Sequence, residues 1–218
     1  MKSYEVNERN KVKRIPKRGS YDSKTLYSIL DRAFICHAAF TLDNQPFIVP
    51  MAFGRKGNKL YLHGATSSRI MKNLGKGIPV CICVTHLDGV VMARSLFHSS
   101  LNYRSAVVFG KATLVEDKKK NSALKIITDQ ISKGRWDEAR KPNFKELKAT
   151  AILQLEIEQA SSKIRTGPPL DEPEDYYLPI WAGVIPMEIK ALPAKTDPNS
   201  TVKAKMPESV KTFRKAFA

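Results

Sequence analysis

The sequence contains no apolar run of the about 18 residues that a transmembrane helix requires. Its first residues, 1–14, are polar and basic and lack the apolar stretch of a secretory signal. Cysteine is scarce, and the three present, Cys36, Cys81 and Cys83, lie in apolar, strand-like runs. An odd number of cysteines in such runs indicates reduced core residues rather than disulfides. These absences predict a cytoplasmic protein that does not enter a membrane.

Patterns typical of several function classes are also missing. No histidine pair has the spacing of a zinc site, and no carboxylate lies near His63 or His98 in the sequence. The GxGxxG of a dinucleotide-binding Rossmann unit is absent, and Ser99 and Ser100 lack a nucleophile-elbow pattern. There is no zinc-finger spacing, RNP-like aromatic pattern or basic heptad region. We therefore expect no metal centre, hydrolytic triad or sequence-specific nucleic-acid site.

Acidic residues are few for the number of basic ones, and the formal net charge is +16. Seven Lys/Arg accompany two acids in residues 1–20, ten accompany five in 117–148, and six accompany two in 192–218. Residues 21–116 and 149–191 carry +6 and −4. The charge is thus a property of appendages rather than of a groove. Nucleic acid is not an expected partner, although a basic protein that contacts polyanions weakly stays open as an alternative.

This distribution predicts a basic, loosely ordered leader at residues 1–20, one domain at 21–191 and a basic C-terminal extension at 192–218. Apolar residues at helical spacing predict helices at residues 23–34, 67–76, 118–132 and near 207–216. Alternating or continuous apolar runs predict strands at residues 35–42, 46–54, 59–63, 79–87, 90–97, 105–115, 149–165 and 180–191. Many short antiparallel strands with a few helices predict a mainly β (α+β) barrel rather than a doubly wound sheet.

Local signals mark the ends of these elements. Ser23 is the expected N-cap of the first helix. Asp43–Asn44 and Asp88–Gly89 are expected turns between strands. Residues 134–142 are expected to form a charged connector.

The most informative segment is residues 60–72, LYLHGATSSRIMK. It predicts a strand, a tight turn at His63–Gly64–Ala65 and a helix that begins at Ser67 or Ser68. A helix N-terminus suits a phosphate, the Ser68 hydroxyl adds a donor, and Arg69 and Lys72 add cations on one face. An ordinary strand–turn–helix with solvated basic residues is the competing interpretation.

Two further segments carry groups that a planar ligand could use. Residues 98–105, HSSLNYRS, are dense in hydrogen-bond donors beside a predicted strand, which suits flavin carbonyls or phosphate. A polar loop that caps a barrel end would look the same. Trp181, followed by Ala182–Gly183, is either a stacking lid over a ligand or a core residue.

Several motifs in order support a family resemblance: RGSYDSKTLYSIL (18–30), ICHAAF (35–40), PFIVPMAFG (46–54), residues 60–72, RSLFHSSLNYRSAVVFG (94–110) and PIWAGVIP (179–186). Together they resemble the flavin-binding split-barrel family related to pyridoxamine 5'-phosphate oxidase, in the branch of nitroimidazole-reductase-like resistance proteins. The resemblance covers roughly residues 14–190. The C-terminal part of the sequence lacks the arginine and histidine pattern with which pyridoxamine 5'-phosphate oxidases bind the phosphate of a vitamin B6 substrate.

The resemblance implies a split β-barrel homodimer with non-covalent FMN at the subunit interface. It implies that the FMN phosphate is held by the first turn and helix, namely His63, Gly64, Ala65, Ser68, Arg69 and Lys72. It implies further cofactor contacts from the second segment and the aromatic lid, namely Ser99, Ser100, Asn102, Tyr103, Arg104, Ser105 and Trp181. No residue is identified as a catalytic acid or base.

The expected function is flavin-dependent oxidation or reduction of a small organic substrate, with NAD(P)H or another reductant recharging the flavin. The alternative is a non-catalytic carrier that binds flavin or haem, with haem ligated by His63 or His98.

Overall fold

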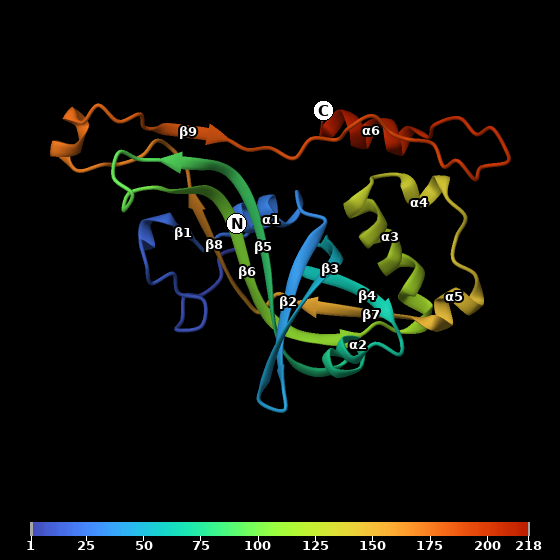
Figure 1. Cartoon of the computed structure of the whole chain (residues 1–218). Helices are drawn as coiled ribbons and strands as arrows, with labels where there is room; N and C mark the ends of the chain where they lie inside the picture. The colour runs from blue at the N-terminus through green and yellow to red at the C-terminus, as the bar shows by residue number, and fades with distance from the viewer. Residues whose placement is uncertain (1, 218) are drawn as a thin grey trace. The chain divides into compact units, whose positions relative to one another are not determined.

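The computed structural model describes residues 2–217, which fold into antiparallel strands with short helices (Figure 1). The strands are β1 Gly19–Ser20, β2 Ile35–Leu42, β3 Gln45–Lys56, β4 Lys59–Ala65, β5 Lys76–Met92, β6 Ser100–Leu114, β7 Thr150–Glu156, β8 Gln159–Arg165 and β9 Gly183–Pro186. The α-helices are α1 Ser23–Leu30, α2 Arg69–Leu74, α3 Lys120–Ile131, α4 Arg135–Glu138, α5 Phe144–Ala149 and α6 Glu208–Ala216. Short 3-10 turns are η1 Pro16–Arg18, η2 Asp117–Lys119 and η3 Pro173–Tyr177.

The strand order is β1-β8-β6-β7-β4-β3-β2-β5-β9, and β6 also pairs with β5. Hydrogen-bonded neighbours therefore form a closed ring through β6, β7, β4, β3, β2 and β5. Each strand of this ring is therefore paired on both sides, while β1 and β9 remain the terminal strands of the sheet. The predicted fold class, a mainly β split barrel with a few helices, is confirmed.

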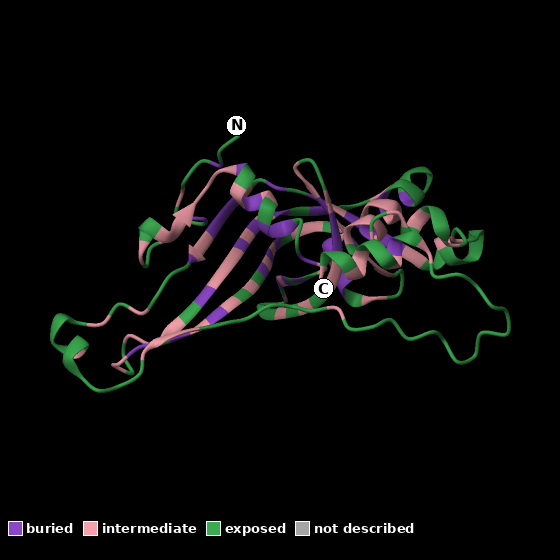
Figure 2. Cartoon of the chain, turned by 90° about the horizontal axis from the view of Figure 1, so that it is seen from above, coloured by how far each residue is buried: buried purple, intermediate pink, exposed green. Residues whose placement is uncertain are grey.

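The chain divides into two compact units, each built from three chain segments. Unit 1 consists of residues up to 50, 79–110 and 157–188, and unit 2 consists of 51–78, 111–156 and those from 189 onward. Buried residues alternate with more exposed ones along the strands, as expected where each strand has one face in a core (Figure 2).

Unit 1 has α1 and the strands β2, β5 and β8 around its core. Leu26, Ile29 and Leu30 of α1 are fully buried, since they recur at helical spacing. The first residues join this unit: Tyr4 and Asn10 are buried, and the Asn10 side-chain amide donates to the Ala160 carbonyl (3.2 Å). Tyr4 and Asn10 are thus packed in unit 1, whereas the polarity of residues 1–20 predicts a loosely ordered leader.

Unit 2 is centred on the β4–β7 ladder, which runs in register from Lys59↔Glu156 to Ala65↔Thr150. Helix α3 packs on it, with Ala123 and Ile127 against Ile152. Gly54 of β3 lets this helix approach closely, because an added Cβ would lie 2.7 Å from the Ile126 carbonyl oxygen and the Ile127 Cα.

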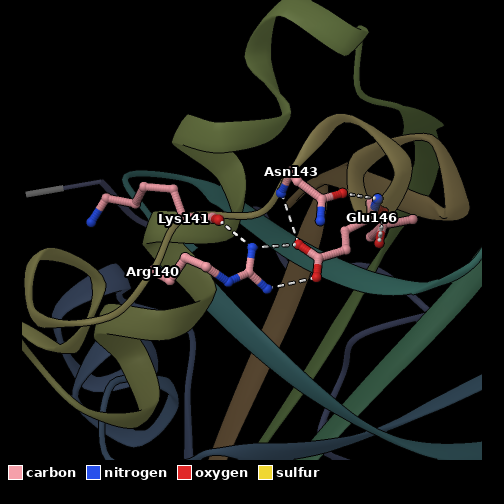
Figure 3. Close-up of polar contacts among 5 residues, drawn as sticks. Arg140, Lys141, Asn143 and Glu146 are labelled. Atoms are coloured by element: carbon pink, nitrogen blue, oxygen red, sulfur yellow. Dashed lines mark hydrogen bonds and ion pairs between the residues drawn. The ribbon is translucent and has the colours of Figure 1, made fainter.

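A network of hydrogen bonds fixes the start of α5 (Figure 3). The Asn143 side chain accepts from the Glu146 N–H (3.0 Å), and the Glu146 carboxylate accepts from the Asn143 N–H (2.8 Å). Arg140 adds a bidentate ion pair to that carboxylate (2.7 and 3.1 Å). Arg140 and the Asn143 N–H lower the pKa of Glu146 to about 2. This capping box makes a short helix in the segment after the predicted connector.

Several predicted boundaries are corrected by the structure. The N-cap of α1 is Asp22 rather than Ser23, because its carboxylate accepts from the Thr25 N–H (2.8 Å). Asp88–Gly89 is not a turn: β5 continues through it, with Gly89 paired to Pro186 of β9. Pairing with a neighbouring strand thus overrides a local turn signal.

Other elements also differ from the sequence pattern. The predicted strand at 149–165 is two strands, β7 and β8, that pair with different neighbours. The connector at 134–142 contains α4. The turn at Asp43–Asn44 is confirmed by positive φ angles of 49° and 58°, and the C-terminal helix is confirmed as α6.

Candidate functional site

The first predicted group forms one continuous segment of unit 2. His63, Gly64 and Ala65 end β4, and Ser68 precedes α2 as its N-cap without a side-chain capping bond. The turn between them is held by the Thr66 N–H, which donates to the Ala149 carbonyl (2.9 Å). The predicted strand and helix are confirmed here, but the turn is not at His63–Gly64–Ala65. These three residues still pair with β7, and the turn follows at residues 66–67.

Helix α2 presents its cations to solvent because its apolar side packs inward. Met71 and Leu74 are fully buried, while Arg69 and Lys72 are exposed one turn apart. Gly64 makes this packing possible, since an added Cβ would lie 3.0 Å from Met71 Cγ. The structural role of Gly64 is therefore to seat α2 on β4.

His63 is the half-buried histidine of this group. Its Nδ1 is buried and has no hydrogen-bond partner among the residues that the structure describes. Burial lowers the pKa of His63, so the imidazole is neutral at pH 7. A buried nitrogen without a partner is a group that a bound polar ligand could satisfy.

The second group lies on a strand of unit 1, because β6 begins at Ser100. The predicted polar loop is thus displaced to the residues before β6. Most of the predicted donors already bond within the chain. Ser99 Oγ donates to the Ser95 carbonyl (3.3 Å), the buried Asn102 donates to the Gly167 carbonyl (3.1 Å), and Ser105 Oγ donates to the Lys163 carbonyl (3.3 Å).

Arg104 forms a bidentate ion pair with Asp88. Its Nε and Nη2 donate to the two carboxylate oxygens at 2.8 and 2.7 Å. The Arg104 guanidinium lowers the pKa of Asp88, and Asp88 raises the pKa of Arg104. This carboxylate offsets the positive charge that Arg104 would bring to a bound ligand.

Trp181 precedes β9 and is not a core residue, because 68 % of its surface is exposed. The space next to Gly183 is filled by the indole: an added Cβ at Gly183 would lie 2.9 Å from Trp181 Cζ2. The core interpretation of Trp181 is therefore wrong, and the gap left by Gly183 receives this ring.

The other histidines are placed differently from His63. His86 Nε2 lies 2.9 Å from the Ile29 carbonyl oxygen, and His98 Nε2 lies 3.4 Å from Glu172 Oε1. His37 is exposed on β2. Among residues 2–217, no three His, Cys, Asp or Glu side chains are grouped to hold a metal ion, and no helix is long and apolar enough to cross a membrane.

A cleft of about 430 Å³ in unit 1 contains none of the predicted residues. Phe40 and Phe47 stack on its wall with ring centroids 5.4 Å apart, and Arg9 lies 4.7 Å from the Phe109 ring centroid. Arg9, the Phe40–Phe47 hairpin and Phe109 are far apart in the sequence, and only the fold brings them together. Arg165, buried on β8, is a second feature that the sequence analysis missed.

Apart from Trp181, the predicted residues thus fall into two groups, and each group lies within one unit. The group at 63–72 contains a hydroxyl, a half-buried imidazole and two exposed cations. The group at 99–105 is largely committed to bonds within unit 1.

The family model described as pyridoxamine 5'-phosphate oxidase matches residues 22–164. No match was found among curated protein sequences.

Two solved structures resemble almost the whole chain. The flavocytochrome Anf3 from Azotobacter vinelandii is 38 % identical, with a TM-score of 0.90 over 95 % of this chain and 97 % of that one. The FAD and haem binding protein from Mycobacterium smegmatis is 37 % identical, with a TM-score of 0.87 over 90 % and 97 %. A candidate 5-nitroimidazole antibiotic resistance protein from Bacteroides thetaiotaomicron is 24 % identical, with a TM-score of 0.57 over 67 % and 86 %, and shares the fold.

Proposed function

Because the chain belongs to the pyridoxamine 5'-phosphate oxidase family, we propose that it is a flavin-binding protein that transfers electrons to a small organic substrate. The observation that carries this proposal is the 38 % identity to a flavocytochrome over nearly the full length of both chains. A bound flavin supplies hydride or single-electron transfer.

The residues at 63–72 fit the phosphate end of such a cofactor. Arg69 and Lys72 are exposed cations, Ser68 makes no side-chain capping bond, and His63 Nδ1 is buried without a partner in the described chain. A phosphate monoester or diphosphate would bond such donors. The sequence resemblance favours FMN, whereas the Mycobacterium smegmatis relative binds FAD. We therefore propose a bound flavin, and whether it is FMN or FAD is the first result to obtain.

Homodimerisation, NAD(P)H as the reductant and a cytoplasmic location belong to the same proposal. All three cysteines are free thiols, which supports a reducing compartment.

The test is an absorbance spectrum of the purified protein, taken before and after incubation with excess FMN or FAD and desalting. Retained flavin bands, with the released flavin identified by chromatography, are the expected result. Oxidation of NAD(P)H with a nitro-aromatic or quinone acceptor separates an enzyme from a carrier. A protein that retains neither flavin overturns the proposal.

Haem binding beside flavin is the second candidate, favoured by the flavocytochrome and by the FAD and haem binding relative. His63 is the better of the two predicted ligands, because His98 is beside Glu172. A haem ligated by His63 would take this side chain from the flavin phosphate contacts proposed above. A Soret band in the same spectrum that is lost in His63→Ala and kept in His98→Ala supports this assignment. Its persistence in His63→Ala contradicts it.

A further inference from the structure

Arg165 is a buried cation of unit 1 without an anionic partner. Its surface is 5 % exposed, and its guanidinium donates only to neutral acceptors: the Asn102 side-chain oxygen and the carbonyls of Gly167 (3.4 Å) and Pro168 (3.3 Å). Its Nε is buried with no hydrogen-bond partner in the described chain. No carboxylate of residues 2–217 forms an ion pair with it.

A buried charge without a counter-charge is costly, so proteins pair almost all of them. The same unit does so elsewhere: Arg104 pairs with Asp88, and Arg94 pairs with Asp171. Burial, with the nearby Arg18 adding repulsion, lowers the pKa of Arg165. The exception at Arg165 therefore indicates that a negative charge from outside the described chain belongs there.

Two more cations extend this feature. Lys163 lies two residues before Arg165 on β8 and so shares its face of the strand. Gly19, next to Arg18, pairs with Lys163 in the β1–β8 ladder. Arg18 and Lys163 are half-buried, and neither forms an ion pair with a described carboxylate. Tyr103 and Ser105 of β6 are the register partners of Arg165 and Lys163 on the same face of the sheet.

We propose that Arg18, Lys163 and Arg165 form a binding site for a phosphate-type oxyanion. Three positive charges match a phosphate or pyrophosphate, and the planar guanidinium donors of arginine suit its oxygens. The β1–β8–β6 face is distinct from the residues at 63–72. The anion belongs to a separate phosphorylated small molecule, or it is the flavin phosphate if that group is bound here instead of at residues 63–72.

The test is calorimetric titration of the flavin-free full-length chain with inorganic pyrophosphate at fixed ionic strength. Saturable binding is expected, weakened roughly tenfold or more in Arg18→Ala and in Lys163→Ala. Lys24→Ala, which removes an exposed charge from α1 of the same unit, is the matched control and should bind like the wild type. Absence of saturable binding, or equal weakening in all three variants, overturns the site in favour of general attraction to a basic protein.

Arg165→Met gives an independent readout, because it removes the positive charge and keeps most of the length of the side chain. The variant should fold, and pyrophosphate should no longer raise its melting temperature as it raises that of the wild type. An undiminished rise contradicts the role of Arg165.

The same titration on flavin-loaded protein identifies the source of the anion. Loss of pyrophosphate binding assigns the site to the flavin phosphates, and retained binding assigns it to a second phosphorylated ligand. A chain that binds pyrophosphate at these residues but retains no flavin keeps this site and overturns the proposed function instead.

Discussion

His63 lies near the end of β4, and its burial makes the stability of the protein depend on pH in a measurable way. Because burial lowers its pKa in the folded state, the unfolded chain binds more protons below the ordinary value of 6.5. The free energy of unfolding should therefore fall as the pH drops below about 6.5. His63→Gln should reduce this loss between pH 8 and 5.5 in urea unfolding. His37→Gln, at an exposed position, should keep it, and an unchanged slope in His63→Gln would contradict the burial argument.

Arg69 is the residue on which the phosphate placement depends most directly. Arg69→Ala should weaken flavin binding by roughly 1.5–3 kcal/mol, since it removes a charge-assisted bond to phosphate. Fluorescence titration with FMN and FAD measures the change. Lys118→Ala removes a cation that is 77 % exposed and paired with Glu116, and it should bind flavin like the wild type. Equal affinities in Arg69→Ala and the wild type would move the phosphate away from α2.

The surroundings of a residue could be predicted from the sequence where they depend on neighbouring residues, and not where they depend on a partner far along the chain. The exposed pair Arg69 and Lys72 follows from helical spacing, which needs no tertiary information. The neutralisation of Arg104 by Asp88 depends on the packing of β5 beside β6, and the two residues are 16 apart in the sequence. Arg165 was missed for the same reason, because its burial and its neutral partners come from the fold.

Helix α1 depends on one side chain at its start. Hydrogen bonds from the Ser20 hydroxyl and the Thr25 N–H lower the pKa of Asp22 from 3.8 to about 2. Asp22→Ala should reduce the free energy of unfolding by about 0.5–2 kcal/mol at pH 7, with a smaller loss in Asp22→Asn. Because the folded pKa is depressed, this stabilisation is present above pH 4 and lost as the pH falls towards 2. Denaturant unfolding at pH 7 and pH 2.5 measures both the size of this stabilisation and its dependence on pH. If Asp22→Ala lowered the free energy of unfolding equally at the two pH values, the role of the Asp22 carboxylate would be contradicted.

Strand β3 and helix α3 pack without a side chain at Gly54. Gly54→Ala should destabilise the protein by more than about 2 kcal/mol, because the new methyl group meets backbone atoms of α3 that cannot move independently. Gly77→Ala meets no atom within 4 Å and should cost only the strain of its φ of 81°, about 1–2 kcal/mol. Thermal unfolding of the two variants compares these losses of stability. A larger loss in Gly77→Ala than in Gly54→Ala would contradict the argument from the close packing of β3 and α3.

The elements found from the sequence are those with a strong period and clear ends. The strand β2, the hairpin turn after it and the helix α6 were predicted within one or two residues. The errors, a turn at Asp88–Gly89 and a single strand over 149–165, occur where lateral pairing decides the outcome. Sequence patterns within a few residues carry no information on how β5 pairs with β9 or how β6 pairs with β8.

On the scale of the whole molecule, unit 1 exposes large apolar side chains that a soluble monomer would rarely retain. Leu96, Phe97 and Tyr177 are 94 %, 86 % and 90 % exposed. We expect the chain, of 24.5 kDa, to sediment at twice its mass. A Leu96→Ser, Phe97→Ser double variant should dissociate at micromolar concentration. A wild type that sediments as a single chain across that range would contradict the homodimer.

The resemblance to the pyridoxamine 5'-phosphate oxidase family and the split-barrel class were both recognisable from the sequence. The motifs at residues 18–30, 94–110 and 179–186, which occur in this order along the chain, indicated both. The fit of the first residues against β8 was not foreseen, because polar, basic composition gives no sign of the buried Tyr4 and Asn10.

The pairing of β1 with β8 has a consequence during synthesis. Gly19 and Ser20 find their partners only at Lys163 and Ser162, more than 140 residues later. At translation rates of about 5–20 residues per second, the emerging N-terminal segment waits roughly 7–30 s before β8 has been made. During that interval its basic residues are open to chaperones and to the polyanionic surface of the ribosome. The synthesis of β8, late in the chain, therefore determines when β1, the first strand to be made, can join the sheet.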